Sequence, residues 1–134
     1  MKTNLQPFLK EKGYSITKQR VVVFELLALH GAMTMHELAE HAKGIMDRAS
    51  VYRTINLFER LGIVERLNIG WKYKVELSDT FVEHHHHLSC INCHKVTPIN
   101  EAELEKFITA IAARRSFKAL NHQIEIQGFC KDCQ

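Results

Sequence analysis

The stretch RASVYRTINLFERLGIVERLNIGWKYKVEL, residues 48–77, has different hydrophobic periodicities on the two sides of Gly62. Before the glycine, apolar residues recur every three or four positions, which predicts a helix over about residues 48–61. After it, apolar and polar residues alternate, which predicts two short strands joined around residues 68–70. A helix that leads directly into a hairpin is typical of the second half of a winged-helix module.

Further helices are predicted upstream of this stretch. The first covers about residues 3–12, and the second begins after Thr17 as its N-cap and reaches His30. Thr34 and Glu37 have the spacing of a capping box, which predicts a third, short helix. Helices followed by a hairpin indicate a winged helix, in which the last helix enters the major groove of DNA.

Polar side chains of the last predicted helix can bind DNA. The ring of Tyr52 can pack on thymine methyl groups, and Arg53 can reach a guanine edge or a phosphate. Further candidates for DNA contacts are Ser50, Thr54, Arg20 and Lys18. The alternative interpretation is an ordinary solvated helix surface, on which such residues are common.

Composition and charge fit a cytoplasmic protein with a basic first half. The 134 residues are 46% hydrophobic and 25% charged, which is ordinary for one globular domain or two small ones. Residues 1–77 carry 12 basic against 8 acidic residues, and residues 78–134 carry 6 against 7, so the first half is the expected partner of a polyanion. We expect neither a secretory signal nor a membrane span, because no apolar run is long enough.

The second half of the chain contains two Cys-x-x-Cys pairs. Each pair presents two sulfurs from one tight turn, and two such turns complete a tetrahedral thiolate site for structural zinc. The pairs are Cys90 with Cys93 and Cys130 with Cys133. A redox dithiol and a pair of disulfides are the alternatives, and zinc is favoured because close cysteine pairs in a reducing compartment are typical metal ligands.

Between and before the cysteines, the pattern predicts a small sheet with one helix. We expect strands near residues 84–90, 95–99 and 122–129 and a helix over about residues 101–114. Asn100 with Glu103 is expected to cap the helix, and Ile124 and Ile126 are expected to face inward. A three-stranded antiparallel sheet with one helix buries little, so zinc and dimerisation are its expected supports.

Four consecutive histidines begin the second half. Side chains alternate along a strand, so His84 and His86 should face one way, and His85 and His87 the other. One strand can therefore supply two separate metal sites, and His122 and Glu105 are available from the neighbouring strand and helix. The alternatives are a fragment of a purification tag and a run of exposed polar residues.

Nearly the whole chain resembles the ferric uptake regulator family of metal- and peroxide-sensing repressors. The resemblance rests on GYSITKQR, ASVYRTINLFERLGIVER, HHHHLSCINC, NHQIEIQGFC and the closing CKDC, in this order. It implies an α+β protein with a winged-helix DNA-binding domain over residues 1–77, a hinge over residues 78–83, and a small α/β domain over residues 84–134. That second domain would form a homodimer and bind metal, with structural zinc on the four cysteines.

The resemblance also implies two further metal sites. One uses His84, His86, Glu105 and His122. A sensing site at the hinge would use His85 and His87, with a carboxylate from Glu76, Asp79 or Glu65. Iron-sensing members often have an aspartate where this chain has His86, so the first of these sites is richer in nitrogen and more suited to zinc. Many members also have a histidine at the position of Ala32, and zinc sensors often have a linker cysteine, which this chain lacks.

The expected function is therefore metal-responsive repression of transcription, with the metal as corepressor. Bound metal would hold two recognition helices about one DNA turn apart, so that the dimer binds a palindromic operator. Zinc and ferrous iron are the expected regulatory metals, with manganese as a further candidate, and no enzymatic activity is expected. The alternatives are a small zinc-dependent hydrolase and a metal-storage protein that does not bind DNA.

Overall fold

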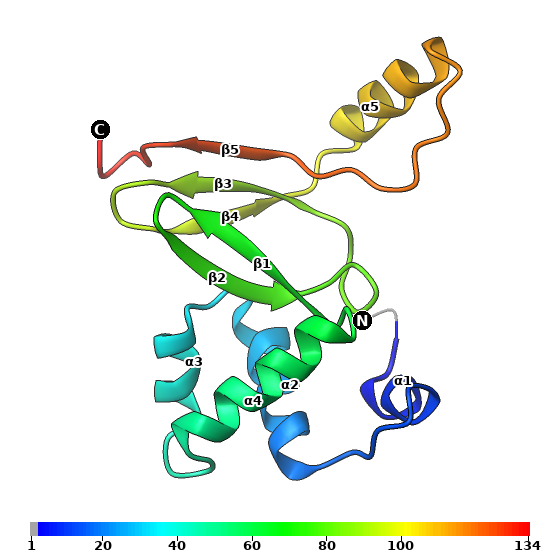
Figure 1. The fold of residues 1–134 in the computed structure, drawn as a ribbon. Coiled ribbons are helices and arrows are strands. Elements are labelled where there is room, and N and C mark those ends of the chain that lie inside the picture. Colours follow the sequence, from blue (N-terminus) through cyan, green and yellow to red (C-terminus); the bar gives the residue numbers. More distant parts are fainter. Residues whose placement is uncertain (1–2) are drawn as a thin grey trace. The chain divides into compact units, whose positions relative to one another are not determined.

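The computed structural model describes residues 3–134, which fall into two compact units (Figure 1). The first unit ends at Glu83 and the second begins at His84. None of the helices within residues 3–134 is long and apolar enough to cross a membrane.

The first unit contains four helices and an antiparallel hairpin. These elements are α1 (Leu5–Glu11), α2 (Lys18–His30), α3 (Met35–His41), α4 (Arg48–Arg60), β1 (Val64–Ile69) and β2 (Lys72–Leu77). The winged-helix prediction is confirmed by this order. Strand β1 extends to Ile69, further than predicted. This is possible because Gly70 adopts a φ of 59° and lets the chain reverse directly after Ile69.

Local side-chain hydrogen bonds explain where α2, α3 and α4 begin. The Thr17 hydroxyl accepts the backbone N–H of Arg20, and Thr34 and Glu37 form the predicted capping box. Asp47 caps α4 by accepting the N–H of Ser50 at 2.7 Å. Each cap satisfies an N–H group that the first turn of a helix leaves without an intrahelical acceptor.

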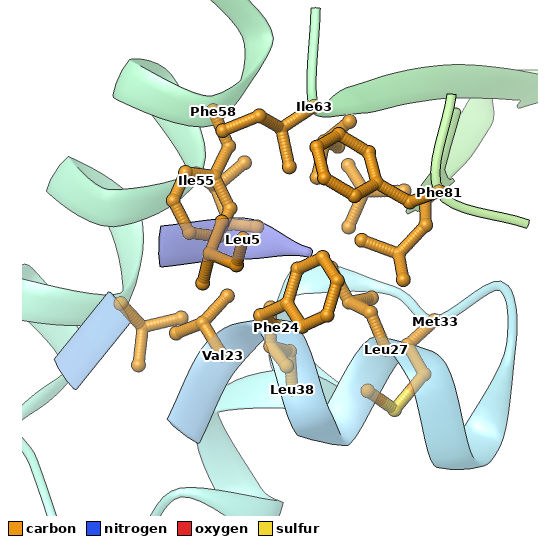
Figure 2. Close-up of a cluster of buried hydrophobic side chains, with 14 of the residues drawn as sticks. Leu5, Val23, Phe24, Leu27, Met33, Leu38, Ile55, Phe58, Ile63 and Phe81 are labelled. Carbon is orange, nitrogen blue, oxygen red and sulfur yellow. The ribbon is translucent and has the colours of Figure 1, made fainter. Parts of the chain in front are cut away.

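The segment over residues 78–83, predicted as a hinge, packs with the first unit. Phe81 is fully buried and lies among the core side chains, together with Phe24 (Figure 2). Its ring makes edge-to-face contacts with Phe8 and Phe24 at centroid distances of 5.1 and 5.3 Å. The Ser78 hydroxyl donates to the carbonyl of Gly62 at 2.7 Å. These contacts hold the chain against the core of the first unit up to the point where that unit ends.

Replacing Phe81 with alanine is expected to destabilise the first unit by about 3–5 kcal/mol, because it removes a fully buried ring and two aromatic contacts. Chemical denaturation monitored by circular dichroism measures this loss. Leu29→Ala is the matched control, since Leu29 is 77% exposed. If the two variants were equally stable, Phe81 would not hold this segment in place.

The second unit contains the elements β3 (His86–Cys90), β4 (Val96–Ile99), α5 (Ala102–Arg114) and β5 (Glu125–Gly128). Its sheet has the order β4-β3-β5. The prediction of an all-antiparallel sheet was wrong, because β5 pairs with β3 in parallel. Strand β4 ends beside His86, at the start of β3. After α5 the chain returns beside His87, so β5 starts at the same end of the sheet as β3 and runs in the same direction.

Two other details of the second unit differ from the sequence prediction. Helix α5 has Glu101 as its N-cap, so Asn100 lies outside the helix and the predicted cap with Glu103 is not formed. Ile126, predicted to face inward, is 54% exposed, and Phe107 on α5 is 60% exposed. All residues of α5 remain at least partly exposed, since one helix and three short strands cannot enclose a core of their own.

Candidate metal centres and DNA-binding surface

The two Cys-x-x-Cys turns bring their sulfurs together at one end of the second unit. All four sulfurs lie within 4.8 Å of one another, and the Cys93 and Cys130 sulfurs are 3.8 Å apart. A zinc–sulfur bond of about 2.3 Å gives a sulfur–sulfur distance of about 3.8 Å in a tetrahedral site. A disulfide needs about 2.05 Å, so the arrangement fits a metal and the cysteines are free thiols.

Hydrogen bonds and burial shift the pKa values of two of the cysteines in opposite directions. Backbone N–H groups of Cys130 and Cys93 point at the Cys90 sulfur and lower its pKa to about 6. The pKa of Cys133 rises to about 11: a hydrogen bond with Asn92 lowers it, but the neighbouring thiols, Cys130 first, and burial outweigh that bond. The hydrogen bond of Asn92 with Cys133 was not predicted from the sequence. The position of Asn92 between the first two cysteines was the signal that could have indicated it.

The affinity of this site for zinc is expected to fall more steeply below about pH 6. The lowered pKa of Cys90 means that its thiolate is present above about pH 6 and is lost as the pH falls through that value. Below it, zinc must displace one more proton, which adds about a tenfold change in Kd per pH unit. Zinc competition with a chelator measures the slope, and one constant slope between about pH 8 and about pH 5 would contradict the expectation.

A second cluster consists of three histidines and a glutamate, which come from β3 and the residues just before it, from α5, and from the segment before β5. The ligand atoms of His84, His86, Glu105 and His122 all lie within 4.8 Å of one another. The Nε2 atoms of His84 and His122 are 3.0 Å apart. Glu105 lies 2.6 Å from the Nε2 atoms of both His86 and His122. These nitrogen and carboxylate donors converge as they do around zinc or ferrous iron.

The carboxylate of Glu105 stays ionised in this cluster. Burial raises its pKa, but hydrogen bonds with His86 and His122 and the charges of His122 and His84 lower it further, so the net shift is downward. An ionised carboxylate is the form that binds a cation, so the side chain is ready for a metal ion.

The predicted alternation of the four histidines is confirmed within the second unit. His84 and His86 meet at a centroid distance of 4.7 Å, and His85 and His87 meet separately at 4.8 Å. The carboxylates predicted to complete the hinge site belong to the first unit. Glu65 on β1 pairs with Glu76 on β2, and Asp79 follows β2.

The candidate DNA-binding side chains gather around α4 and the start of α2. Tyr52 and Arg53 are exposed, with the guanidinium of Arg53 donating to the Ser50 hydroxyl at 2.9 Å. A hollow of about 330 Å³ lies beside them, lined by Thr17, Gln19, Arg20, Ser50, Arg53, Thr54 and Leu57. Arg20 and Arg53 make this hollow suitable for a phosphate, and Lys18 is exposed nearby in the first turn of α2.

Thr54 was predicted to lie on the exposed face of α4 and does not. It is 7% exposed, and its hydroxyl donates to the Ser50 carbonyl at 2.8 Å. A threonine inside a helix often bonds the carbonyl four residues earlier, which the helical spacing of these two residues allows. Thr54 therefore forms part of the floor of the hollow rather than reaching outward.

Comparison with known proteins identifies the family. The sequence profile described as "Ferric uptake regulator family" matches residues 11–127. The chain belongs to the ferric uptake regulator family. The ferric uptake regulation protein of Legionella pneumophila is 35% identical to this member over an alignment of 135 positions, which covers 94% of this chain and 96% of the relative.

Solved structures of family members share the fold of this regulator. The Vibrio cholerae ferric uptake regulator is 29% identical, with a TM-score of 0.77, over 95% of this chain and 100% of that one. The Pseudomonas aeruginosa regulator, solved with manganese, is 25% identical, with a TM-score of 0.75, over 96% and 99% of the two chains. The chain is thus a metal-responsive transcriptional regulator with a winged helix, and its second unit contains two groups of residues that could hold a metal ion.

Proposed function

We propose that this regulator is a cytoplasmic homodimer that binds a palindromic DNA operator when it holds a regulatory metal ion. The observation that carries this proposal is the convergence of two separate donor sets in one small unit that follows a winged helix. A hydrolase or a storage protein would leave the basic winged helix without a role, so we propose that the chain has no enzymatic activity.

Zinc on the four cysteines supports the second unit, and the cluster around Glu105 holds a second metal ion. Four sulfurs complete the tetrahedral coordination of the zinc ion, so the thiolate set leaves no open position for a substrate. The cluster around Glu105 mixes nitrogen and oxygen donors, and its His84, Glu105 and His122 side chains are partly exposed, which suits a metal that exchanges with the cell. Zinc and ferrous iron both fit imidazole with carboxylate, and manganese fits less well because it prefers oxygen ligands.

The dimer interface is proposed to cover the apolar surface that the second unit leaves exposed. Phe107 on α5, Ile126 on β5 and Phe117 after the helix are all more than half exposed in the single chain. Residues 78–134 are close to electrical neutrality, with 6 basic and 7 acidic residues, so little charge repulsion opposes association. A second copy of the chain would bury this surface and supply the core that one copy lacks.

In the proposed regulatory step, bound metal restricts the movement of the first unit relative to the second. His85 and His87 lie at the start of the second unit, directly after Glu83, and a carboxylate from Glu76, Asp79 or Glu65 of the first unit would complete their site. Support comes from the Vibrio cholerae relative, whose structure is described as showing rearrangement of the DNA-binding domains. A tenfold gain in DNA affinity needs only about 1.4 kcal/mol of difference between the metal-binding free energies of the form that binds DNA and the form that does not.

Arg53→Ala is expected to weaken binding to the operator by about 1–3 kcal/mol, because the variant loses an exposed guanidinium next to the proposed phosphate hollow. The duplex is one selected from a random-sequence pool with the metal-loaded wild-type protein, and fluorescence anisotropy measures its affinity. Arg60→Ala, at the other end of α4, is the matched control. Equal losses in both variants would show a general charge effect, and no loss in Arg53→Ala would remove α4 from the DNA interface.

A further inference from the structure

Arg48 is the first residue of α4, the helix that carries the candidate DNA-binding side chains, and it is exposed. Its guanidinium lies 5.9 Å from the centroid of the Tyr52 ring, one helical turn further along. Among residues 3–134, no side chain or backbone group forms a hydrogen bond or an ion pair with this guanidinium, and the carboxylate of Asp47 accepts the N–H of Ser50 instead. The N–H donors of Arg48 are therefore available to a partner outside the chain.

Other arginines of the same surface are engaged within the protein. Arg53 donates to the hydroxyl of Ser50 at 2.9 Å, and Arg20 donates to the backbone carbonyl of Ser15. These bonds restrain two guanidinium groups beside the hollow that suits a phosphate. The guanidinium of Arg48 contacts only the face of an aromatic ring, which orients it without using its donors.

The position of Arg48 does not help the helix to form. The N-terminal end of a helix carries a partial positive charge, so an acidic side chain stabilises the first turn and a cation destabilises it. The first turn of α4 contains no acidic residue, and the cap comes from Asp47 just before it. The local structure thus offers no reason for an arginine at this position, and a partner outside the chain would supply one.

The edge of a guanine in the major groove matches this arrangement. A recognition helix presents its N-terminal residues to base edges, and arginine binds the O6 and N7 atoms of guanine with two N–H groups. An aromatic ring packs on the methyl group of thymine. Neighbouring base pairs are about 3.4 Å apart along the duplex, so a guanidinium and a ring centroid 5.9 Å apart can reach neighbouring base pairs.

We propose that Arg48 determines sequence specificity by binding O6 and N7 of one guanine in each half of the operator, while the Tyr52 ring packs on the methyl group of a thymine next to that guanine. This inference rests on the proposed DNA-binding function. It gives the two arginines in the first half of α4 different tasks, since Arg53 lies beside the phosphate hollow and Arg48 does not line it.

The test compares the full-length, metal-loaded wild type with Arg48→Ala. Arg60→Ala is the matched control, because it removes an exposed guanidinium from the other end of α4. Each protein selects duplexes from the same random-sequence pool, and fluorescence anisotropy measures affinity for the duplex that the wild type selects. A second duplex carries 7-deazaguanine, which lacks N7 and leaves every phosphate in place. A third carries uracil for thymine, which removes only the methyl group.

The wild type is expected to prefer guanine by roughly tenfold or more at one position of each half-site, beside a thymine whose replacement by uracil weakens binding. Arg48→Ala should lose this preference, bind the selected duplex roughly tenfold more weakly and no longer respond to 7-deazaguanine at that position. Arg60→Ala should keep the preference and the response. The melting temperature of Arg48→Ala should be no lower than that of the wild type, because a cation is removed from the start of a helix.

A phosphate contact would give a different result. Arg48→Ala would then weaken binding to all sequences equally and reduce the dependence of affinity on salt, and this outcome would overturn the proposal. An unchanged preference for guanine in Arg48→Ala would overturn it as well. A wild-type protein that selects no duplex from the pool would overturn the proposed function itself.

Discussion

Cys93→Ser is expected to release zinc, unfold the second unit and leave the chain monomeric, while the first unit keeps its helices. The second unit depends on the metal because α5 buries none of its described residues and the sheet has only three short strands. Structural zinc contributes on the order of 10–16 kcal/mol of apparent binding free energy in small domains, which is more than such a unit can replace.

Zinc content per chain, analytical ultracentrifugation and circular dichroism measure the three expected effects of Cys93→Ser. The control is Lys131→Ser, which changes an exposed residue within the second Cys-x-x-Cys turn and leaves all four sulfurs in place. The control should keep zinc and remain dimeric. A folded, dimeric Cys93→Ser protein without zinc would show that the four-cysteine site is not structural.

The double variant His85→Ala, His87→Ala is expected to abolish the dependence of DNA binding on metal while the fold and the cysteine-bound zinc remain. The two imidazoles meet at the start of β3 and are not part of the cluster around Glu105, so their removal leaves the ligands of that cluster in place. Affinity for the selected operator duplex, measured with and without added metal, should differ by at least about tenfold in the wild type and hardly at all in the variant.

His36→Ala, His41→Ala is the matched control for the double variant, since it removes two exposed histidines of α3 from the first unit. This control should retain the wild-type response to metal. If the His85 and His87 variant responded to metal as the wild type does, the regulatory ion would bind elsewhere, and the cluster around Glu105 would become the candidate switch.

Features set by neighbouring residues could be predicted from the sequence. The caps at Thr17 and Thr34 depend on residues three positions away, and the Cys-x-x-Cys turns are local as well. The alternation of the histidine run follows from strand geometry alone, which is why both histidine pairs were predicted correctly.

Features set by distant contacts could not be predicted in this way. The parallel pairing of β5 depends on which end of the sheet the chain reaches after α5, and strand periodicity does not contain that information. Phe81 lies in a short segment without hydrophobic periodicity, so no sequence pattern indicates that it is buried against Phe8 and Phe24. The N–H of Ile124 that engages His86 is a backbone group 38 residues away, and no side-chain motif marks it.

The most direct test of metal-dependent regulation is a titration of DNA binding with metal. The wild-type protein is purified without a tag and without oxygen, and a weak chelator removes the regulatory metal but leaves zinc on the cysteines. Affinity for the selected duplex is then measured while zinc, ferrous iron or manganese is added. We expect one of these metals to tighten binding by at least about tenfold in the dimer. Equal affinity with and without every metal, or no duplex binding even at low salt, would contradict the proposed function.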